Sequence, residues 1–303
     1  MWKWLILCCV LVGFVLFRIA LKKTLQRIDG LPLSKKAVLV GWQFLICALL
    51  SAAALPVFKA TGLESPITQF NYLWAVVAVL GVFNAYGAYC QWCAIDISMS
   101  KTSIGTQIDD AIAILIGYFI LNESNLFGWQ LLSGIAMCFA AALILVGFKS
   151  RDLKNWLLVK YVMKYSLISG VTMASLRFFN LNDLPLSEFL VCWYGGSTVG
   201  SWLVLLSKRI LAKKKIDLRP TPEDIKEVPV LSIFIWVAML LHYSVAYYAP
   251  VAIYQPILLV SEAVLPTLVG LYYFHERKEM MAREWLAIGV GIIGTILVAM
   301  SSF

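Results

Sequence analysis

Apolar segments about as long as a membrane-spanning helix follow one another along almost the whole chain of 303 residues. A helical bilayer crossing needs roughly 20 mostly apolar residues, and short clusters of charge, Pro and Gly separate ten such segments here. The composition agrees, because 61% of the residues are hydrophobic and 14% are charged, whereas soluble domains carry about 25% charged residues. The sequence therefore excludes a water-soluble fold and predicts an all-α, polytopic membrane protein. The ten helices are predicted at about residues 2–21, 37–58, 71–95, 101–121, 127–147, 160–180, 186–207, 228–249, 252–274 and 281–301.

The chain leaves no room for a separate soluble domain. Its longest polar stretch runs only from Lys208 to Glu227, so we expect residues 1–303 to form a single membrane domain. The apolar run that starts at Trp2 is followed by Arg18 and by no small-residue cleavage site, which makes it the first helix and not a signal peptide. Compact loops and the lack of an evident targeting peptide favour a plasma (inner) membrane, with an organelle left open.

The placement of the positive charges predicts an orientation in the membrane. Of the 25 lysines and arginines, all but Lys3, Lys59 and Arg177 fall in or beside the odd-numbered loops. Cytoplasmic loops carry the excess of Lys and Arg, so we predict that the odd-numbered loops are cytoplasmic and that both termini lie outside. The net charge of +8 then reflects membrane topology, and we expect no nucleic-acid partner.

The cysteines and the short motifs give no sign of an enzyme. All seven cysteines lie inside apolar segments, and the C-x-x-C pair of Cys90 and Cys93 falls on a hydrophobic helix, where packing is the simplest interpretation. The sequence has no phosphate-binding Gly loop, no metal-ligand spacing and no Ser/His/Asp set. We therefore expect no catalytic activity, no cofactor and no metal.

An internal repeat is the most specific pattern in the sequence. An acidic residue, a glycine and a glutamate recur in the same order in two places, each pair 153 positions apart. They are Asp109, Gly117 and Glu123 in the first half and Glu262, Gly270 and Glu276 in the second. Five helices per repeat would insert the second copy (about 159–303) upside down relative to the first (about 1–148). Inverted repeats are typical of secondary transporters, because rocking one half against the other exposes a central site to each side in turn.

In these features the chain resembles the EamA family of the drug/metabolite transporter superfamily. The resemblance lies in the end of each half, where an apolar helix with Gly117 or Gly270 is followed by Glu123 or Glu276 and then by a Gly-rich final helix. It implies a basket of ten helices, with a central cavity lined largely by helices one, three, four, six, eight and nine. It also implies cytoplasmic termini, which is the opposite of the orientation that the loop charges predict.

Carboxylates near the middle of two predicted helices are the strongest candidates for a functional site. Asp109 lies in the fourth helix and Glu262 in the ninth, and an ionisable group at the bilayer centre costs at least about 2.5 kcal/mol, so it normally serves a proton, an ion or a substrate. Burial and a like-charged neighbour, here Asp110, both favour the neutral form of a carboxylate, which suits a proton-coupled antiporter. The repeat favours Asp109 over Asp110 as the cavity-facing residue. The alternative, which stays open for Asp110 in particular, is a structural hydrogen bond between helices.

Aromatic side chains on the third and eighth helices are further candidates. A site that combines acidic side chains with aromatic rings suits an organic cation, because ring faces attract ammonium groups. The alternative for such residues is an aromatic belt at the membrane interface, to which we assign Trp92, Tyr247 and Tyr248. The deeper set, for which both interpretations stay open, is Tyr86, Tyr89, His242 and Tyr243.

Several polar residues are assigned supporting roles. Gln255 stands 153 positions after a threonine of the fourth helix, so we expect it to add polar lining to the site. Arg18 and Arg177 are candidate counter-ions, but both lie within two turns of a predicted helix end and are expected to reach the interface. Glu123 and Glu276 fall in tight turns, where we expect each to cap the helix that follows.

Glycines at helical spacing predict close contacts between helices. The pair Gly196-x-x-x-Gly200 and the set Gly289, Gly291 and Gly294 are interpreted as packing positions, because small residues let helix backbones approach in a membrane.

Together these patterns predict a secondary active transporter that moves a small polar metabolite, cationic or zwitterionic, by alternating access with proton coupling. The expected partners are the small-molecule substrate and the lipid bilayer, and a homodimer is allowed. A flippase for a lipid-linked carrier is one alternative, which would need a lateral opening between helices. A non-transporting membrane scaffold is another, and no loop is long enough to give it an ordered extramembrane surface.

Overall fold

The computed structural model describes residues 8, 10–27, 33–60, 72–121, 128–146, 153–212, 222–248, 250–251, 254–255, 258, 265–276 and 281–300. This part of the chain contains helices and connecting turns and no strand. In chain order the helices are η1 (Val10–Leu16, π-helical), α2 (Phe17–Arg27), α3 (Leu33–Ala60), α4 (Tyr72–Ile97), α5 (Met99–Gly105), α6 (Gln107–Ile120), α7 (Trp129–Val146), α8 (Leu153–Leu181), α9 (Leu186–Ala212), α10 (Pro222–Tyr248), η3 (Val269–Tyr273, π-helical) and α12 (Ala282–Met300).

The predicted all-α fold class is confirmed. Helical residues lie in each of the ten predicted segments, and five helical spans have the length and hydropathy that a membrane crossing requires. These five spans are Lys35–Phe58, Tyr72–Ile97, Met99–Ile120, Leu186–Ile210 and Lys226–Tyr248. They indicate an integral membrane protein, and ten crossings in two inverted repeats remain a prediction.

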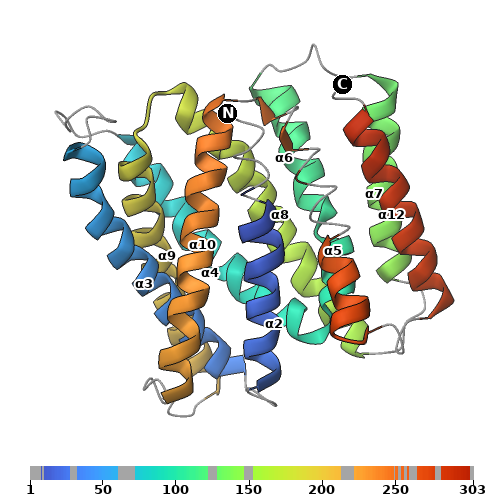
Figure 1. The fold of residues 1–303 in the computed structure, drawn as a ribbon, viewed down its shortest axis with the longest axis horizontal. Helices are drawn as coiled ribbons and strands as arrows, with labels where there is room; N and C mark the ends of the chain where they lie inside the picture. Colours follow the sequence, from blue (N-terminus) through green and yellow to red (C-terminus); the bar gives the residue numbers. More distant parts are fainter. Residues whose placement is uncertain are drawn as a thin grey trace.

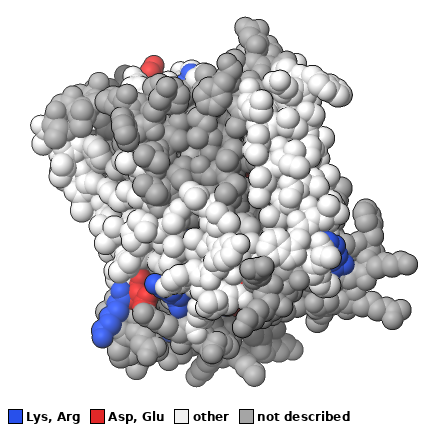
Figure 2. Space-filling model, turned by 45° about the vertical axis from the view of Figure 1, so that its right-hand side comes forward, with Lys and Arg blue, Asp and Glu red and all other residues white. Residues whose placement is uncertain are grey.

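The outer surface of the bundle is apolar between its two ends. Large apolar side chains such as Phe83, Leu167 and Leu203 are exposed along the long helices, as expected where lipid is the surrounding solvent. In Figure 2 most of the Lys and Arg atoms in view lie in the lower half of the molecule, and the described side chains above them are mostly uncharged. This distribution matches the predicted concentration of positive charge on one side of a membrane.

Close helix pairs hold the bundle together. α7 packs against α12 at one side of the molecule, and α4 packs against α8 and α9 behind α10 and α2 (Figure 1). On α9, a Cβ atom added at Gly196 would stand 2.7 Å from the carbonyl carbon of Ala78, and one at Gly200 would stand 2.7 Å from Cα of Val82. The predicted packing role of Gly196 and Gly200 is therefore confirmed. The same prediction for Gly289 is wrong, because no described atom of a neighbouring helix lies within 4 Å of an added Cβ there.

The predicted fourth helix is divided into two. It was expected to be continuous over 101–121, but α5 ends at Gly105 and α6 starts again after a turn at Thr106. The segment before the break is rich in Ser and Thr, whose hydroxyls bond to backbone carbonyls one turn back: Ser103 to Met99 at 2.9 Å and Thr106 to Ser103 at 3.2 Å. Such bonds compete with the helical ladder and bend helices. As a result, the acidic pair falls in the first turn of α6, where the helix dipole favours negative charge.

Candidate functional site

Two adjacent buried carboxylates form the centre of the candidate site. Asp109 and Asp110 are only 3% and 2% exposed. The Asp110 backbone N–H donates to Asp109 Oδ1 at 2.9 Å, and the Ser169 hydroxyl on α8 faces the same carboxylate. Asp110 Oδ1 accepts a hydrogen bond from the Gln255 side-chain amide. Its Oδ2 has no hydrogen-bond partner within the described part of the chain. Both acids therefore lie inside the bundle, where Gln255 contacts Asp110.

Arg18 is the positive partner of this acidic pair. Its side chain is 1% exposed, its Nη1 donates to Ser103 Oγ at 3.0 Å, and its guanidinium lies within electrostatic reach of both carboxylates and of Tyr165. The prediction that Arg18 reaches the membrane interface is wrong. The first helix continues to Arg27, beyond its predicted end near residue 21, so Arg18 lies deeper than its place in the sequence suggested.

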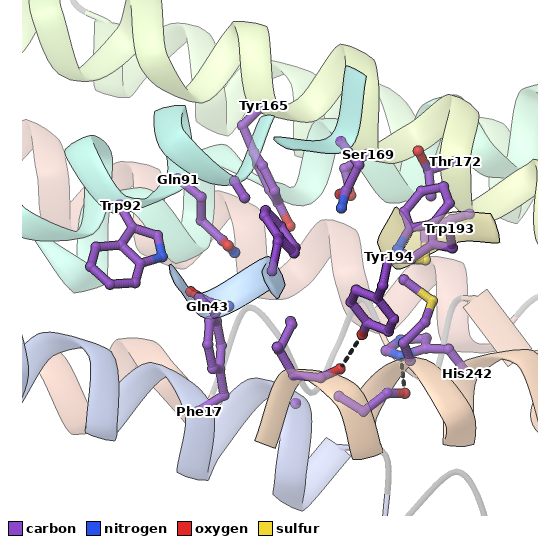
Figure 3. Close-up of a pocket in the computed structure, with 18 of the residues that line it drawn as sticks. Phe17, Gln43, Gln91, Trp92, Tyr165, Ser169, Thr172, Trp193, Tyr194 and His242 are labelled. Carbon is purple, nitrogen blue, oxygen red and sulfur yellow. Dashed lines mark hydrogen bonds between the residues drawn. The ribbon is translucent and has the colours of Figure 1, made fainter. Parts of the chain in front are cut away.

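A cavity of about 80 Å³ lies between the helices and is lined in part by Arg18. Figure 3 shows Gln43, Tyr165 and His242 among the side chains that surround it. It could hold only a few water molecules, each of which occupies about 30 Å³ in the liquid. Its walls come from η1 and α2, α3, α4, α8, α9 and α10. Among the described residues, the lining includes the second and seventh predicted helices and none from the fourth or ninth, which the family resemblance implied. Arg18 lines the cavity and lies within electrostatic reach of both carboxylates, which do not line it. The polar lining residues are Arg18, Gln43, Asn84, Gln91, Trp92, Tyr165, Ser169, Thr172, Trp193, Tyr194 and His242.

Several polar atoms in the cavity wall can bind a ligand. The indole Nε1 atoms of Trp92 and Trp193 and Oε1 of Gln43 are buried and have no hydrogen-bond partner among the described residues. His242 Nδ1 donates to the Ala238 carbonyl at 2.9 Å, which makes Nε2 the acceptor nitrogen of that ring. The assignment of Trp92 to an interfacial belt is therefore wrong, because this side chain is fully buried.

A second hollow, of about 550 Å³, lies at the end of the bundle that carries the even-numbered loops. It is bordered by the end of α3, the turn between α8 and α9, and the end of α10. Tyr243 lines this hollow and donates to the Leu184 carbonyl at 2.5 Å. Its ring stacks on Phe189 at 4.4 Å, and Phe189 stacks on Trp193 of the central cavity at 5.7 Å. Three aromatic rings therefore stand between the hollow and the cavity.

A polar network closes the opposite end, where the odd-numbered loops lie. Glu276, just after η3, accepts hydrogen bonds from Ser98 Oγ at 2.9 Å and from the backbone N–H groups of Met99 and Ser100 at 2.9 and 3.0 Å. It also pairs with Lys22 of α2 at 3.5 Å. Glu276 is thus a cap, as predicted, but of α5 and not of the helix that follows it.

The pKa of Glu276 reflects this network. Burial raises the pKa, but the Ser100 hydroxyl, the Lys22 ammonium and the N–H groups of the α5 N-terminus stabilise the anion more strongly, so the pKa lies below its ordinary value. The carboxylate is therefore charged at neutral pH and holds η3, α5 and α2 together.

The structure places the other predicted site residues away from the cavity. Tyr86 accepts a hydrogen bond from Lys164 Nζ at 2.6 Å, and the Lys208 ammonium lies over the Tyr89 ring, 5.1 Å from its centre. Arg177 Nη1 donates to the Ala246 carbonyl at the end of α10, at 2.9 Å, so it stays near a helix end as predicted. The belt residues Tyr247 and Tyr248 are exposed. Glu123 and Glu262 lie outside the described residues.

Comparison with known proteins finds similarity to solved structures in fold alone. The sequence matches no protein-family profile and no curated protein. Nineteen chains of solved structures match its fold. One of these, described only as "Crystal structure of protein", has a TM-score of 0.63 and 16% sequence identity, and the match covers 99% of this chain and 96% of that chain. The helix arrangement is thus similar to one seen in a crystal over nearly the full length.

Proposed function

We propose that this chain is a secondary active transporter of the drug/metabolite transporter type, which moves a small polar metabolite by alternating access. The observation that carries the proposal is the buried group of Arg18, Asp109 and Asp110 beside a central cavity. Ionisable groups inside a membrane are costly and mark proton, ion or substrate pathways. One guanidinium neutralises one carboxylate, so the remaining negative charge favours binding of a proton or of a cationic group.

Helix packing supports the inverted repeat on which alternating access would depend. A twofold axis in the membrane plane would pair the second predicted helix with the seventh and the fifth with the tenth, and α3 does pack on α9 and α7 on α12. The same axis would relate α4 to α10 and α9 to α3. The contact between α4 and α9 should therefore have a counterpart between α10 and α3, and this contact is also present. These pairings agree with the repeat offset of 153 positions in the sequence.

The two ends of the bundle differ as alternating access requires. The Glu276 network joins α5 and α2 to η3 at the end with the odd-numbered loops. At the other end, the hollow beside Tyr243 approaches the cavity up to the stacked ring of Phe189. Because the central cavity measures only about 80 Å³, it would have to expand before a metabolite could bind there. With the odd-numbered loops in the cytoplasm, the polar network would form the cytoplasmic closure.

The cavity wall favours a zwitterionic cargo over a simple cation. Arg18 lines the cavity directly, whereas the two carboxylates do not line it. Arg18 and the indole N–H groups of Trp92 and Trp193 could bind a carboxylate of the cargo. The aromatic faces beside them could hold its ammonium group.

Transport can be tested in proteoliposomes on a solid-supported membrane. Amino acids, amines and sugars are applied under a proton gradient to the wild type and to the Asp109→Asn and Arg18→Gln variants. The matched control is Glu188→Gln, which neutralises another buried carboxylate; it accepts a hydrogen bond from Trp74 at 2.7 Å and lies outside the cavity lining. Glu262→Gln additionally tests the repeat partner of Asp109.

We expect proton-driven currents with an amino acid that vanish in Asp109→Asn and Arg18→Gln and persist in Glu188→Gln. Unchanged currents in Asp109→Asn would reduce the acidic pair to a structural contact. No current with any cargo would contradict metabolite transport and favour a flippase.

A further inference from the structure

The two carboxylates of the acidic pair differ in the groups that surround them. Asp109 Oδ1 accepts a hydrogen bond from the backbone N–H of Asp110 at 2.9 Å, and the same carboxylate faces the Ser169 hydroxyl. Arg18 interacts with both carboxylates, and its interaction with Asp109 is the stronger one. Asp109 is thus surrounded by hydrogen-bond donors and by a positive charge, which stabilise a charged carboxylate.

Asp110 has less support for a negative charge. It is 2% exposed, its Oδ1 accepts a hydrogen bond from Gln255 Nε2, and its Oδ2 has no partner within the described ranges. The described titratable groups that act on it are Asp109, Arg18 and Tyr165. Arg18 supplies one positive charge for two carboxylates, and like charges on adjacent buried residues repel. A buried charge that is not paired is costly, so the neutral member of the pair should be Asp110.

The Gln255 amide can serve both protonation states of Asp110. It is 2% exposed, and its Oε1 has no hydrogen-bond partner among the residues that the structure describes. A side-chain amide donates through nitrogen and accepts through oxygen. Gln255 donates to Asp110 from Nε2 in this structure, and the same amide turned over would accept the O–H of a protonated Asp110 through Oε1. The backbone N–H that binds Asp109 can only donate.

We propose that Asp110 carries the exchangeable proton of the acidic pair, with Gln255 as its positioning residue. Asp109 stays charged beside Arg18. One proton joins the Asp110 carboxylate from water and later returns to water, and no other bond forms or breaks. The summed charge of Arg18 and the two acids then changes between −1 and 0. That this proton is coupled to transport rests on the proposed function, whereas its position does not.

Infrared spectroscopy can locate the proton on the full-length protein without cargo or gradient, because a protonated carboxyl group absorbs apart from carboxylates and amides. The protein is measured at pH 7 in a detergent without ester groups. Asp109→Asn and Asp110→Asn show whether the band belongs to the pair, and Glu188→Gln is the matched control at another buried carboxylate. Gln255→Leu removes a contact of Asp110, and Ser169→Ala removes a contact of Asp109.

We expect a protonated carboxyl band that is lost in both Asp→Asn variants, because each leaves one carboxylate for one guanidinium, and that persists in Glu188→Gln. Gln255→Leu should shift the band to higher frequency, because hydrogen bonding lowers the stretching frequency of a carboxyl group. Ser169→Ala should leave it in place. A shift in Ser169→Ala, or none in Gln255→Leu, would overturn the assignment to Asp110, and Ser169→Ala alone decides if Gln255→Leu does not fold.

The wild type provides two further outcomes. The band should move to lower frequency in D₂O, because a proton that serves transport must exchange with water; a band that does not move would show a structural proton. A wild type without the band, or a band that survives both Asp→Asn variants, would also overturn the proposal. Transport currents without the band would contradict the proton site alone, and the band without currents would contradict the proposed function alone.

Discussion

Replacing Gly196 by alanine should push α4 and α9 apart. An added Cβ would stand 2.7 Å from the carbonyl carbon of Ala78 and 2.8 Å from its Cα, whereas ordinary contacts begin at 3.4 Å. The obstacle is helix backbone, which cannot rotate away as a flexible side chain can. The Ala78 carbonyl oxygen would stand closer still, so the two helices must separate locally by more than about 0.7 Å, and a gap of 0.5–1 Å already forfeits roughly a quarter to a half of each dispersion contact.

The expected loss of stability is at the upper end of the range for overpacking, about 3 kcal/mol. The adjacent residue provides a matched control, since a Cβ added at Gly195 meets nothing within 4 Å among the described atoms. Both alanines bring the same gain in helix propensity, up to about 1 kcal/mol, so the difference between the two variants isolates the collision. At about 2–4 °C per kcal/mol, Gly196→Ala should unfold about 6–12 °C below Gly195→Ala.

The assay is thermal unfolding of the purified variants in one detergent, followed by circular dichroism and by size-exclusion chromatography of heated samples. Gly195→Ala should unfold at or slightly above the temperature of the wild type. If the two alanine variants unfold within about 2 °C of each other, the close approach of α4 and α9 does not contribute measurably to the stability of the protein.

Two further predictions concern polar contacts at the ends of the bundle. Glu276 has a lowered pKa in the folded protein, so it should stabilise the protein above the unfolded pKa of about 4.3, and this stabilisation should disappear as the pH falls through the folded value. Unfolding temperatures measured from pH 7 to pH 3 should therefore show Glu276→Gln well below the wild type at pH 7 and converging with it in acid; a constant difference would contradict the charged cap. Trp74 Nε1 donates to the buried Glu188 carboxylate at 2.7 Å, and Trp74→Phe should cost about 1.5–3 kcal/mol, the usual contribution of a hydrogen bond to a charged group. Equal unfolding temperatures of Trp74→Phe and wild type, compared at one pH in the same detergent, would show that this bond contributes little.

The break in the fourth helix connects the local sequence with the candidate site. Hydroxyl back-bonding by Ser103 and Thr106 interrupts the helix, and α6 then begins immediately before the acidic pair. Negative charge at a helix N-terminus is stabilised by the helix dipole. Discontinuous helices whose ends point at charged groups are also found at transporter binding sites, so the break is consistent with the proposed role of Asp109.

Hydropathy and spacing alone determined the class of this protein. Ten apolar segments predict a helical membrane bundle, because a helix satisfies its own backbone hydrogen bonds in lipid. Asp109 and Asp110 stand out as acidic residues inside an apolar segment, and Gln255 stands out because it lies 153 positions after a threonine of the fourth predicted helix. Each of these inferences depends on hydropathy, charge or sequence spacing, which do not change with the way the helices pack.

Only the tertiary structure decided which residues meet. α4 is apolar on all sides, so its periodicity does not show which face is interior, and Trp92 was assigned to the surface when it lines the cavity. Arg18 acquires its carboxylate partners from another helix. Glu276 caps a helix that begins 177 positions earlier in the chain. A side chain's direction around its helix and its distant neighbours depend on how the helices pack, and in lipid, where every outer face is apolar, the sequence pattern carries little information about that packing.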